Sequence, residues 1–161
     1  MPLVWGVDPL ADLDFAVTTG NGECIVQLPI GYDDDTDNTV SIFVALSPLP
    51  GGGGHYEHVF CILDADPAST HEDAYWDGQE TVGHFNREDR ELVLSLICSA
   101  TLLAIREIRP PHISHFVHSE NLPAIALRKH QVVMGVFREE GYDVKIAPPY
   151  HGRQAWVATL P

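Results

Sequence analysis

Apolar and polar residues alternate through the first part of the chain, as they do in β-strands with one buried face. Residues 13–18 and 24–28 alternate in this way on either side of Gly20-Asn21-Gly22. Because Asn and Gly accept positive φ, this segment predicts a tight hairpin turn. Residues 39–46 and 58–63 are two further β-type runs. The pattern therefore predicts four strands before residue 64.

The connections between these runs carry turn residues. Gly51-Gly52-Gly53-Gly54 separates the third run from the fourth. A glycine-rich loop can cradle a phosphate, but no Lys-Ser/Thr and no helix start follow here, which favours a flexible hairpin connection. Residues 64–80 form a long acidic stretch that contains Tyr75 and Trp76. We expect a loop there that serves as a contact surface, with the alternative that Trp76 packs back onto the core.

The apolar spacing changes to that of helices after residue 85. Asn86, with Asp89 three residues later, predicts a capped helix N-terminus. The helical spacing of apolar residues continues to Arg109-Pro110-Pro111, where the helix must end. Residues 113–118 then alternate as a strand.

A second helix is predicted to start near Asn121 and to end at Gly141. Residues 142–147 and 154–160 are typical of two closing strands. The predicted order of elements is ββββ-α-β-α-ββ. This order indicates one α/β (α+β) domain over residues 1–161, with a mixed, largely antiparallel sheet and two main helices.

Charge is unevenly distributed along this chain. The 161 residues include 23 Asp and Glu but nine Lys and Arg, which gives a formal net charge of −14. Residues 1–86 contain 15 of the acids and no Lys or Arg, whereas residues 87–161 contain eight acids and all nine bases. The chain therefore consists of an acidic β-rich half, 1–86, and a nearly neutral α-β-α-β-β half, 87–161.

An acidic surface of this strength repels nucleic acids and anionic membranes and attracts basic proteins. We therefore expect a basic protein partner, whose nucleic-acid site the acids could occlude, and no direct binding to nucleic acid or membrane. The alternative is that the acidity serves solubility alone. The candidate partner-binding residues are the acids and aromatics of two predicted loops: Asp33, Asp34, Asp35, Asp37, Asp64, Asp66, Glu72, Asp73, Tyr75, Trp76 and Asp77.

The cellular compartment is predicted from the first residues and from the cysteines. Residues 1–17 hold no basic segment and no long apolar run, so we expect neither a signal peptide nor a membrane anchor, and hence a cytoplasmic protein. Cys24, Cys61 and Cys98 lie far apart within apolar runs. This placement favours buried, reduced thiols over disulfides or a cysteine metal site.

One acidic loop has part of a calcium-binding pattern. Asp33, Asp35 and Asp37 occupy its first, third and fifth positions. Asn38 stands where such loops need Gly, and Val44 stands where they need a bidentate Glu. An acidic hairpin turn is therefore the favoured interpretation.

The histidines do not form a local metal motif. On a strand, His115 points away from the face shared by His112 and His118. A zinc site would therefore need ligands from several segments, which the sequence does not bring together. His130 lies on an apolar helical face, which is typical of a hydrogen-bonded core histidine. We predict no metal ligands and no catalytic residues.

The order of elements over residues 58–160 resembles the GNAT (N-acetyltransferase-like) fold. Asn121 and Ala124, followed by Gly141-Tyr142, are similar to the family's Asn-x-x-Ala helix that closes with Gly-Phe or Gly-Tyr. The resemblance implies acetyl-CoA as the cofactor and N-acyl transfer as the reaction.

The chain departs from that family at the pyrophosphate turn. The family binds pyrophosphate on backbone N–H groups of a Gly-rich turn at the start of its central helix. Residues 83–90 lack those glycines and place acids in the turn. The interval from Asn121 to Gly141 is also longer than the spacing between the corresponding motifs of the family. The tyrosine that serves as the general acid in the family therefore cannot be assigned to a position in this chain. The resemblance implies a divergent scaffold that lacks this turn.

Two functions are consistent with these patterns. The first is a small acidic binding or inhibitor-type protein that uses no cofactor. The alternative is a divergent GNAT-like N-acyltransferase that acts on a cationic amine. A splayed pair of central strands with a bare helix N-terminus between them would favour the enzyme, and a sealed sheet would favour the binding protein.

Overall fold

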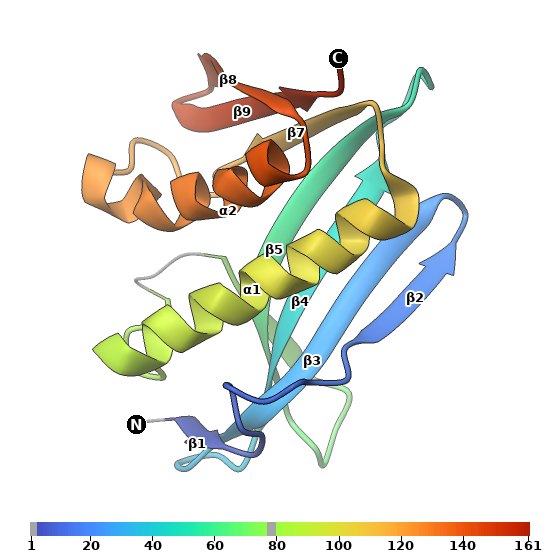
Figure 1. The fold of residues 1–161 in the computed structure, drawn as a ribbon. Helices are drawn as coiled ribbons and strands as arrows, with labels where there is room; N and C mark the ends of the chain where they lie inside the picture. The colour runs from blue at the N-terminus through green and yellow to red at the C-terminus, as the bar shows by residue number, and fades with distance from the viewer. Residues whose placement is uncertain (1–2, 77–79) are drawn as a thin grey trace.

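The computed structural model describes residues 3–76 and 80–161. These residues form one nine-stranded sheet, two α-helices and a short 3-10 helix, η1 (Figure 1). The strands are β1 (Leu3–Trp5), β2 (Ala16–Gly20), β3 (Glu23–Asp33), β4 (Thr39–Pro48), β5 (His55–Ala65), β6 (Glu72–Tyr75), β7 (His112–Phe116), β8 (Asp143–Tyr150) and β9 (Arg153–Thr159). The helices are α1 (Arg87–Ile108), η1 (Ala124–Leu127) and α2 (Arg128–Glu139). This architecture confirms the predicted fold class.

The strands lie in the order β1-β3-β4-β5-β7-β9-β8, with β2 paired to β3 and β6 paired to β5. Among the described strands, neighbours are antiparallel except for β5 and β7, which are parallel. A parallel pair needs a crossover connection, and α1 supplies it. Strands from the acidic half of the chain and strands from the other half therefore belong to the same sheet.

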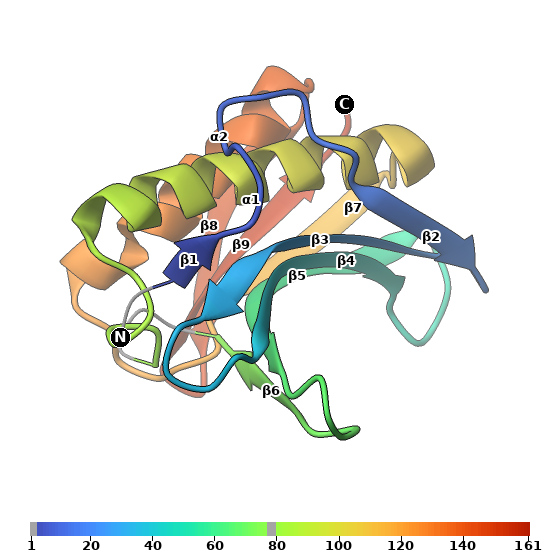
Figure 2. The ribbon, with the colours of Figure 1, turned by 90° about the horizontal axis from the view of Figure 1, so that it is seen from below.

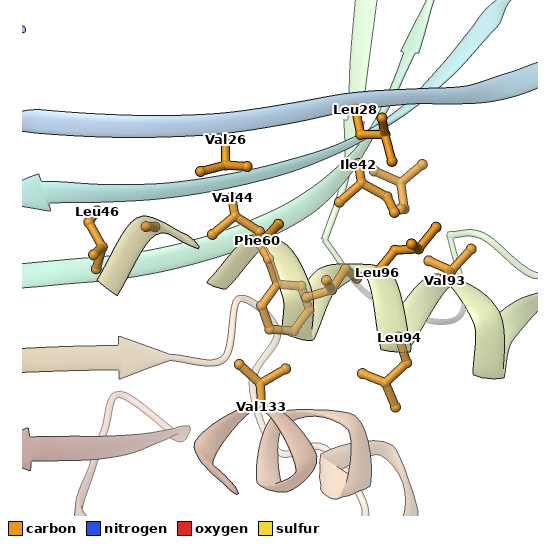
Figure 3. Packing of buried hydrophobic residues seen from close by; sticks show 14 of the residues in the cluster. Val26, Leu28, Ile42, Val44, Leu46, Phe60, Val93, Leu94, Leu96 and Val133 are labelled. Carbon is orange, nitrogen blue, oxygen red and sulfur yellow. The ribbon is translucent and has the colours of Figure 1, made fainter. Parts of the chain in front are cut away.

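Both helices pack on one face of the sheet, as Figure 2 shows. The residues of β3, β4 and β5 that face the helices alternate along each strand, and they include Val26, Val44 and Phe60. Figure 3 shows these side chains directed toward α1 and α2, where Leu96 and Val133 meet them. Burial of each such side chain contributes about 1.5–3 kcal/mol. The core is therefore one layer between the sheet and two helices.

The Asn21-Gly22 turn confirms the predicted hairpin. Asn21 has φ 52° and Gly22 has φ 77°, and these two residues connect β2 to β3. Positive φ at both positions matches the right-handed twist of the flanking strands.

The predicted start of the second helix was wrong. Asn121 is left-handed, with φ 52°, and its N–H donates to the carbonyl of Gly152 at 2.9 Å. Pro123 is extended, with ψ 156°. Asn121 is therefore held by the β8–β9 turn, and the regular α-helix begins only at Arg128, after the 3-10 turn η1. The predicted end is confirmed, because Gly141 follows the helix with φ 93°.

The sheet also contains strands that the sequence pattern did not predict. β1 is three residues long, and β6 lies inside the predicted loop 64–80, where it pairs with the end of β5. β8 continues through Pro148 and Pro149, which the pattern placed in a turn. Proline is tolerated there because β8 is an edge strand.

The three cysteines are free thiols, as predicted. Cys24 and Cys61 are buried, and Cys98 is half-buried. Burial raises the pKa of the Cys61 thiol to about 12 and that of Cys98 to about 11. These thiols therefore stay protonated at neutral pH. Among the described residues, no helix has the length and apolar character needed to cross a bilayer.

Candidate functional site

The centre of the sheet opens where β5 and β7 part. His55–His58 of β5 pair with His112–His115 of β7, and β5 is paired with β6 only from Ile62 onward. Within the described part of the chain, residues 59–61 of β5 therefore have no partner strand on this edge. The parallel pair is sealed at one end and splayed at the other.

A large cleft lies on the helix face beyond this point. Its volume is about 890 Å³, and its walls come from β5, the first half of α1, and residues 122–129. Phe60, Leu94 and Ile97 are among the apolar side chains that line it. Figure 3 shows Phe60 reaching from β5 toward the helices. A cleft of this size and lining suits a ligand with a long apolar portion.

Basic side chains line the same cleft. Arg87 and Arg90 come from the first turn of α1, and Arg128 and Lys129 come from the first turn of α2. Glu91 is the acid among the lining residues, and its Oε1 lies 2.9 Å from Nη1 of Arg128. Among the described residues that line the cleft, basic side chains therefore outnumber acidic ones, although the chain carries −14. The cleft suits a ligand with anionic groups.

The N-terminus of α1 is closed by its own side chains. Asn86 Oδ1 accepts a hydrogen bond from the Asp89 N–H at 2.8 Å, and Asp89 Oδ2 accepts one from the Asn86 N–H at 3.2 Å. The indole of Trp5 donates to the other oxygen of Asp89 at 2.9 Å. This confirms the predicted cap. Because the cap uses donors that a phosphate would need, an anion in the cleft would be bound by side chains.

A smaller cavity of about 160 Å³ lies in the gap between β5 and β7, and we call it the slot. Phe60 and Trp76 line both the cleft and the slot. Of the described residues that line the slot, Glu57 is the one carboxylate, and Arg153 and His130 line it as well. Among the described residues, His130 Nε2 and Arg153 Nε are buried side-chain polar atoms without a hydrogen-bond partner. The slot therefore holds buried polar atoms that a ligand could pair with.

Three buried histidines form a chain beside the slot. Nε2 of His115 lies 2.8 Å from Nδ1 of His130, and the Nδ1 atoms of His115 and His58 are 3.0 Å apart. His58 also contacts the hydroxyl of Thr101 at 3.1 Å. Burial lowers the pKa of His115 to about 4 and that of His130 to about 2, and it lowers the pKa of His58 well below its usual value. The imidazoles of these three histidines are therefore uncharged at neutral pH, as expected of core histidines.

The acids predicted to bind a partner gather at one end of the sheet. The β3–β4 turn and the β5–β6 turn lie together there, because Thr39 pairs with Ala65. Six of the acids are at least partly accessible: Asp34, Asp35, Asp37, Asp66, Glu72 and Asp73. We call these six the acidic patch. Asp77 lies outside the described residues.

The other predicted contact residues lie deeper. Asp33 and Asp64 are buried, so they present no charge at the surface. Tyr75 is half-buried, with its ring centroid 5.2 Å from that of His84. Trp76 is half-buried and stacks on His118, with ring centroids 5.3 Å apart. These two aromatics are therefore not a freely exposed pair.

Asp33, Asp64 and His84 form a second polar cluster, beneath the acidic patch. One ligand atom from each residue lies within 4.8 Å of the other two. Nδ1 of His84 is 2.9 Å from Oδ2 of Asp33, and Nε2 of His84 is 3.8 Å from Oδ2 of Asp64. An imidazole between two carboxylates can hold positive charge, either its own proton or a metal ion.

The sequence analysis missed the cleft-lining bases, the slot and His84. Arg87, Arg90, Arg128 and Lys129 belong to two first helical turns, and only tertiary packing brings those turns together. The one available signal was that all the basic residues follow residue 86.

Comparisons with protein-family models, with curated proteins and with solved structures found no match for this chain.

Proposed function

We propose that the protein is an acyl-CoA-dependent N-acyltransferase that binds its cofactor in the cleft. The observation that carries this proposal is the parting of β5 and β7 beside a cleft that is apolar inside and lined by Arg87, Arg90, Arg128 and Lys129. Splayed central strands were one half of the arrangement expected to favour the enzyme; the other half, a bare helix N-terminus between them, is not met, because Asn86 and Asp89 cap α1.

The residues of the cleft fit the two parts of such a cofactor. The apolar wall around Phe60, Leu94 and Ile97 suits the acyl chain and its linker. Guanidinium and ammonium groups suit phosphates, through charge-assisted hydrogen bonds. Because the cap of α1 already uses the Asp89 N–H, we assign the phosphates to these side chains rather than to helix N–H groups.

The slot supports a position for the chemical step. A bound acyl-CoA supplies a thioester, and transfer needs an amine nitrogen to attack the carbonyl carbon as the carbon–sulfur bond breaks. The amine must lose a proton, and the leaving thiolate gains one. Glu57 is the carboxylate at the slot, so we assign it the role of accepting the amine's proton. The acidic patch would raise the local concentration of a cationic amine.

Acetyl-CoA binding to the full chain, measured by calorimetry, tests the proposal. We expect a Kd below 1 mM and a loss of at least tenfold in the R87Q/K129Q variant. The matched control is R106Q/R138Q, which removes one base from each helix outside the cleft lining. A wild-type Kd above 1 mM, or an equal loss in the control, would contradict it.

Activity is tested by thiol release with a panel of diamines and polyamines. The E57Q variant should lower kcat at least a hundredfold and leave the Kd for acetyl-CoA unchanged. E23Q is the control, because Glu23 is also a half-buried strand glutamate but lies outside the slot. Wild-type binding without any thiol release would reduce the proposal to a CoA-binding protein.

A second candidate function is binding to a basic protein, and the acidic patch is the observation that favours it. The β3–β4 turn that carries part of the patch is held in place, because Asn38 Nδ2 donates to Asp64 Oδ1 at 2.7 Å. Ordered carboxylates on two adjacent turns can complement a basic surface and accelerate association.

Affinity capture from a lysate at low and moderate salt tests this second function. Neutralising the acidic patch (D34N/D35N/D37N/D66N/E72Q/D73N) should abolish capture of a basic protein. The control D8N/D12N/D14N removes acids from an exposed segment elsewhere. Capture that ignores both salt and the patch would leave the acidity as a determinant of solubility alone.

A further inference from the structure

Three segments of the chain converge at the cluster of Asp33, Asp64 and His84. Asp33 ends β3, Asp64 lies near the end of β5, and His84 immediately precedes the capped start of α1. Asp33 and Asp64 are 6% and 5% exposed, and the His84 side chain is 16% exposed. The cluster is therefore nearly enclosed, but His84 leaves it a path to solvent.

Each carboxylate is oriented by a hydrogen bond on its outer oxygen. Asp33 Oδ1 accepts from the Asp35 N–H at 2.8 Å, and Asp64 Oδ1 accepts from Asn38 Nδ2 at 2.7 Å. The Oδ2 atoms of both residues are directed at His84. The backbone of His84 is held as well, because its carbonyl accepts from the Leu3 N–H at 2.8 Å. Such outer hydrogen bonds are what orients the ligands of a metal ion.

The charge of the cluster calls for a cation. Two carboxylates are buried together, and each ion pair found for them within the described residues is to His84. Residues 1–86 contain no Lys or Arg, and the acidic patch lies above the cluster. Buried carboxylates are costly unless a positive charge compensates them. One imidazolium would compensate only one of the two.

We propose that Asp33, Asp64 and His84 bind a divalent transition-metal ion, of the type of Zn²⁺. One imidazole nitrogen with two carboxylate oxygens is a donor set that zinc accepts, with a fourth position left for water. Tetrahedral ligands with bonds of about 2.1 Å are about 3.4 Å apart. In the structure Asp33 faces Nδ1 of His84 and Asp64 faces Nε2, so both carboxylates must turn toward one ring nitrogen to bind the ion. Calcium, by contrast, takes six to eight oxygen ligands. This site does not depend on the acyltransferase proposal.

Calorimetric titration of the full chain tests the site, after treatment with a chelator and its removal. We expect one Zn²⁺ per chain with a Kd below about 10 μM, and at least a hundredfold weaker binding in both D64N and H84A. The matched controls are D66N and H71A, which change the same residue types in the exposed β5–β6 turn. Their Kd should stay within twofold of the wild type.

A second measurement keeps the test independent of variants that fold poorly. Mn²⁺ added to the wild type should broaden the ring NMR signals of His84 at substoichiometric amounts and leave those of buried His115 sharp. The absence of stoichiometric Zn²⁺ binding would overturn the site. Zn²⁺ binding lost equally in D66N, or Ca²⁺ binding tighter than Zn²⁺ binding, would overturn it in favour of diffuse attraction to the acidic patch.

Discussion

β5 contributes one residue to a histidine-containing cluster near each of its ends. The first cluster consists of neutral imidazoles, and the second combines one imidazole with two carboxylates. Near the start of β5, His58 bonds to His115, and His115 bonds to His130. Near its end, Asp64 and the neighbouring Asp33 face His84. In the first cluster the imidazoles have each other and a hydroxyl as partners. In the second, the imidazole has carboxylates.

The partners of each histidine decide what its cluster can bind. Imidazoles buried among imidazoles have a lowered pKa and stay neutral, because a proton there would be both desolvated and repelled. An imidazole between carboxylates gains from holding a proton or a metal ion. β5 therefore contributes to a cluster of uncharged histidines beside the slot and to a cluster that favours binding of a cation beneath the acidic patch.

Acid should destabilise the first cluster, and this is the largest effect we expect. His58, His115 and His130 have a lower pKa when folded than when unfolded, so unfolding takes up protons below about pH 6.5. Their stabilising contribution is full above that pH and falls as the pH drops toward the folded pKa of His115, about 4. Lys129, beside His130, opposes protonation further.

Lowering the pH from 7 to 5 should reduce the unfolding free energy by about 2 kcal/mol for each of these imidazoles, because the unfolded state takes up a proton there. Urea unfolding of the wild type and of H130L measures the effect, and the variant should lose about 2 kcal/mol less over that range. H112Q is the control, since His112 is exposed on the same strand as His115 and should leave the pH dependence unchanged. An identical pH dependence in H130L and the wild type would contradict the prediction.

The second cluster depends on how closely β1 packs against β3. A Cβ on Gly31 would overlap the carbonyl oxygen of Val4, and Gly31 pairs with Trp5 in the ladder. We therefore expect G31A to lower the unfolding free energy by about 3 kcal/mol, because backbone must move. G20A is the control, because a Cβ there meets no atom within 4 Å and should change stability by less than about 1 kcal/mol. Equal losses in the two variants would show that β1 does not constrain β3.

Local signals in the sequence predicted those features that local chemistry determines. Asn21-Gly22 turned the chain because both residues accept positive φ, and Asn86 with Asp89 began α1 because they satisfy each other's backbone donors. Both required only residues within four positions of each other.

The two clusters required information that the alternation pattern alone does not carry. Phe60 and Ile62 face the core, so the parity of β5 could have placed Asp64 on the buried face. Asp33 could not be placed in this way, because a bulge between Pro29 and Gly31 shifts the register of β3. His84 comes from a third segment, and the parting of β5 from β7 is a property of the assembled sheet. Tertiary contacts decide these features.

Removal of a histidine from a buried His–Asp pair should cost more stability than removal of one from an exposed pair. H84A leaves two buried carboxylates without their partner, so we expect a loss of about 2–4 kcal/mol at pH 7 in chelator. H71A removes the imidazole of an exposed pair 3.1 Å from Asp73, and it should cost less than about 0.5 kcal/mol. Thermal or urea unfolding of both variants measures the difference, and similar losses would mean that burial does not set the value of the pair.

The smallest expected effect concerns the cap at the N-terminus of α1. N86A removes the side-chain acceptor for the Asp89 N–H and should cost about 1 kcal/mol in urea unfolding.

The effect of N86A on the Kd for acetyl-CoA discriminates between two ways of binding the phosphates. If side chains such as Arg87 and Lys129 bind the phosphates, the Kd of N86A should match that of the wild type. If the freed helix N–H groups bind them, N86A should bind more tightly, because removing the cap exposes donors at the positive end of the helix dipole. A tighter Kd would therefore move the phosphate site from the side chains to the N-terminus of α1.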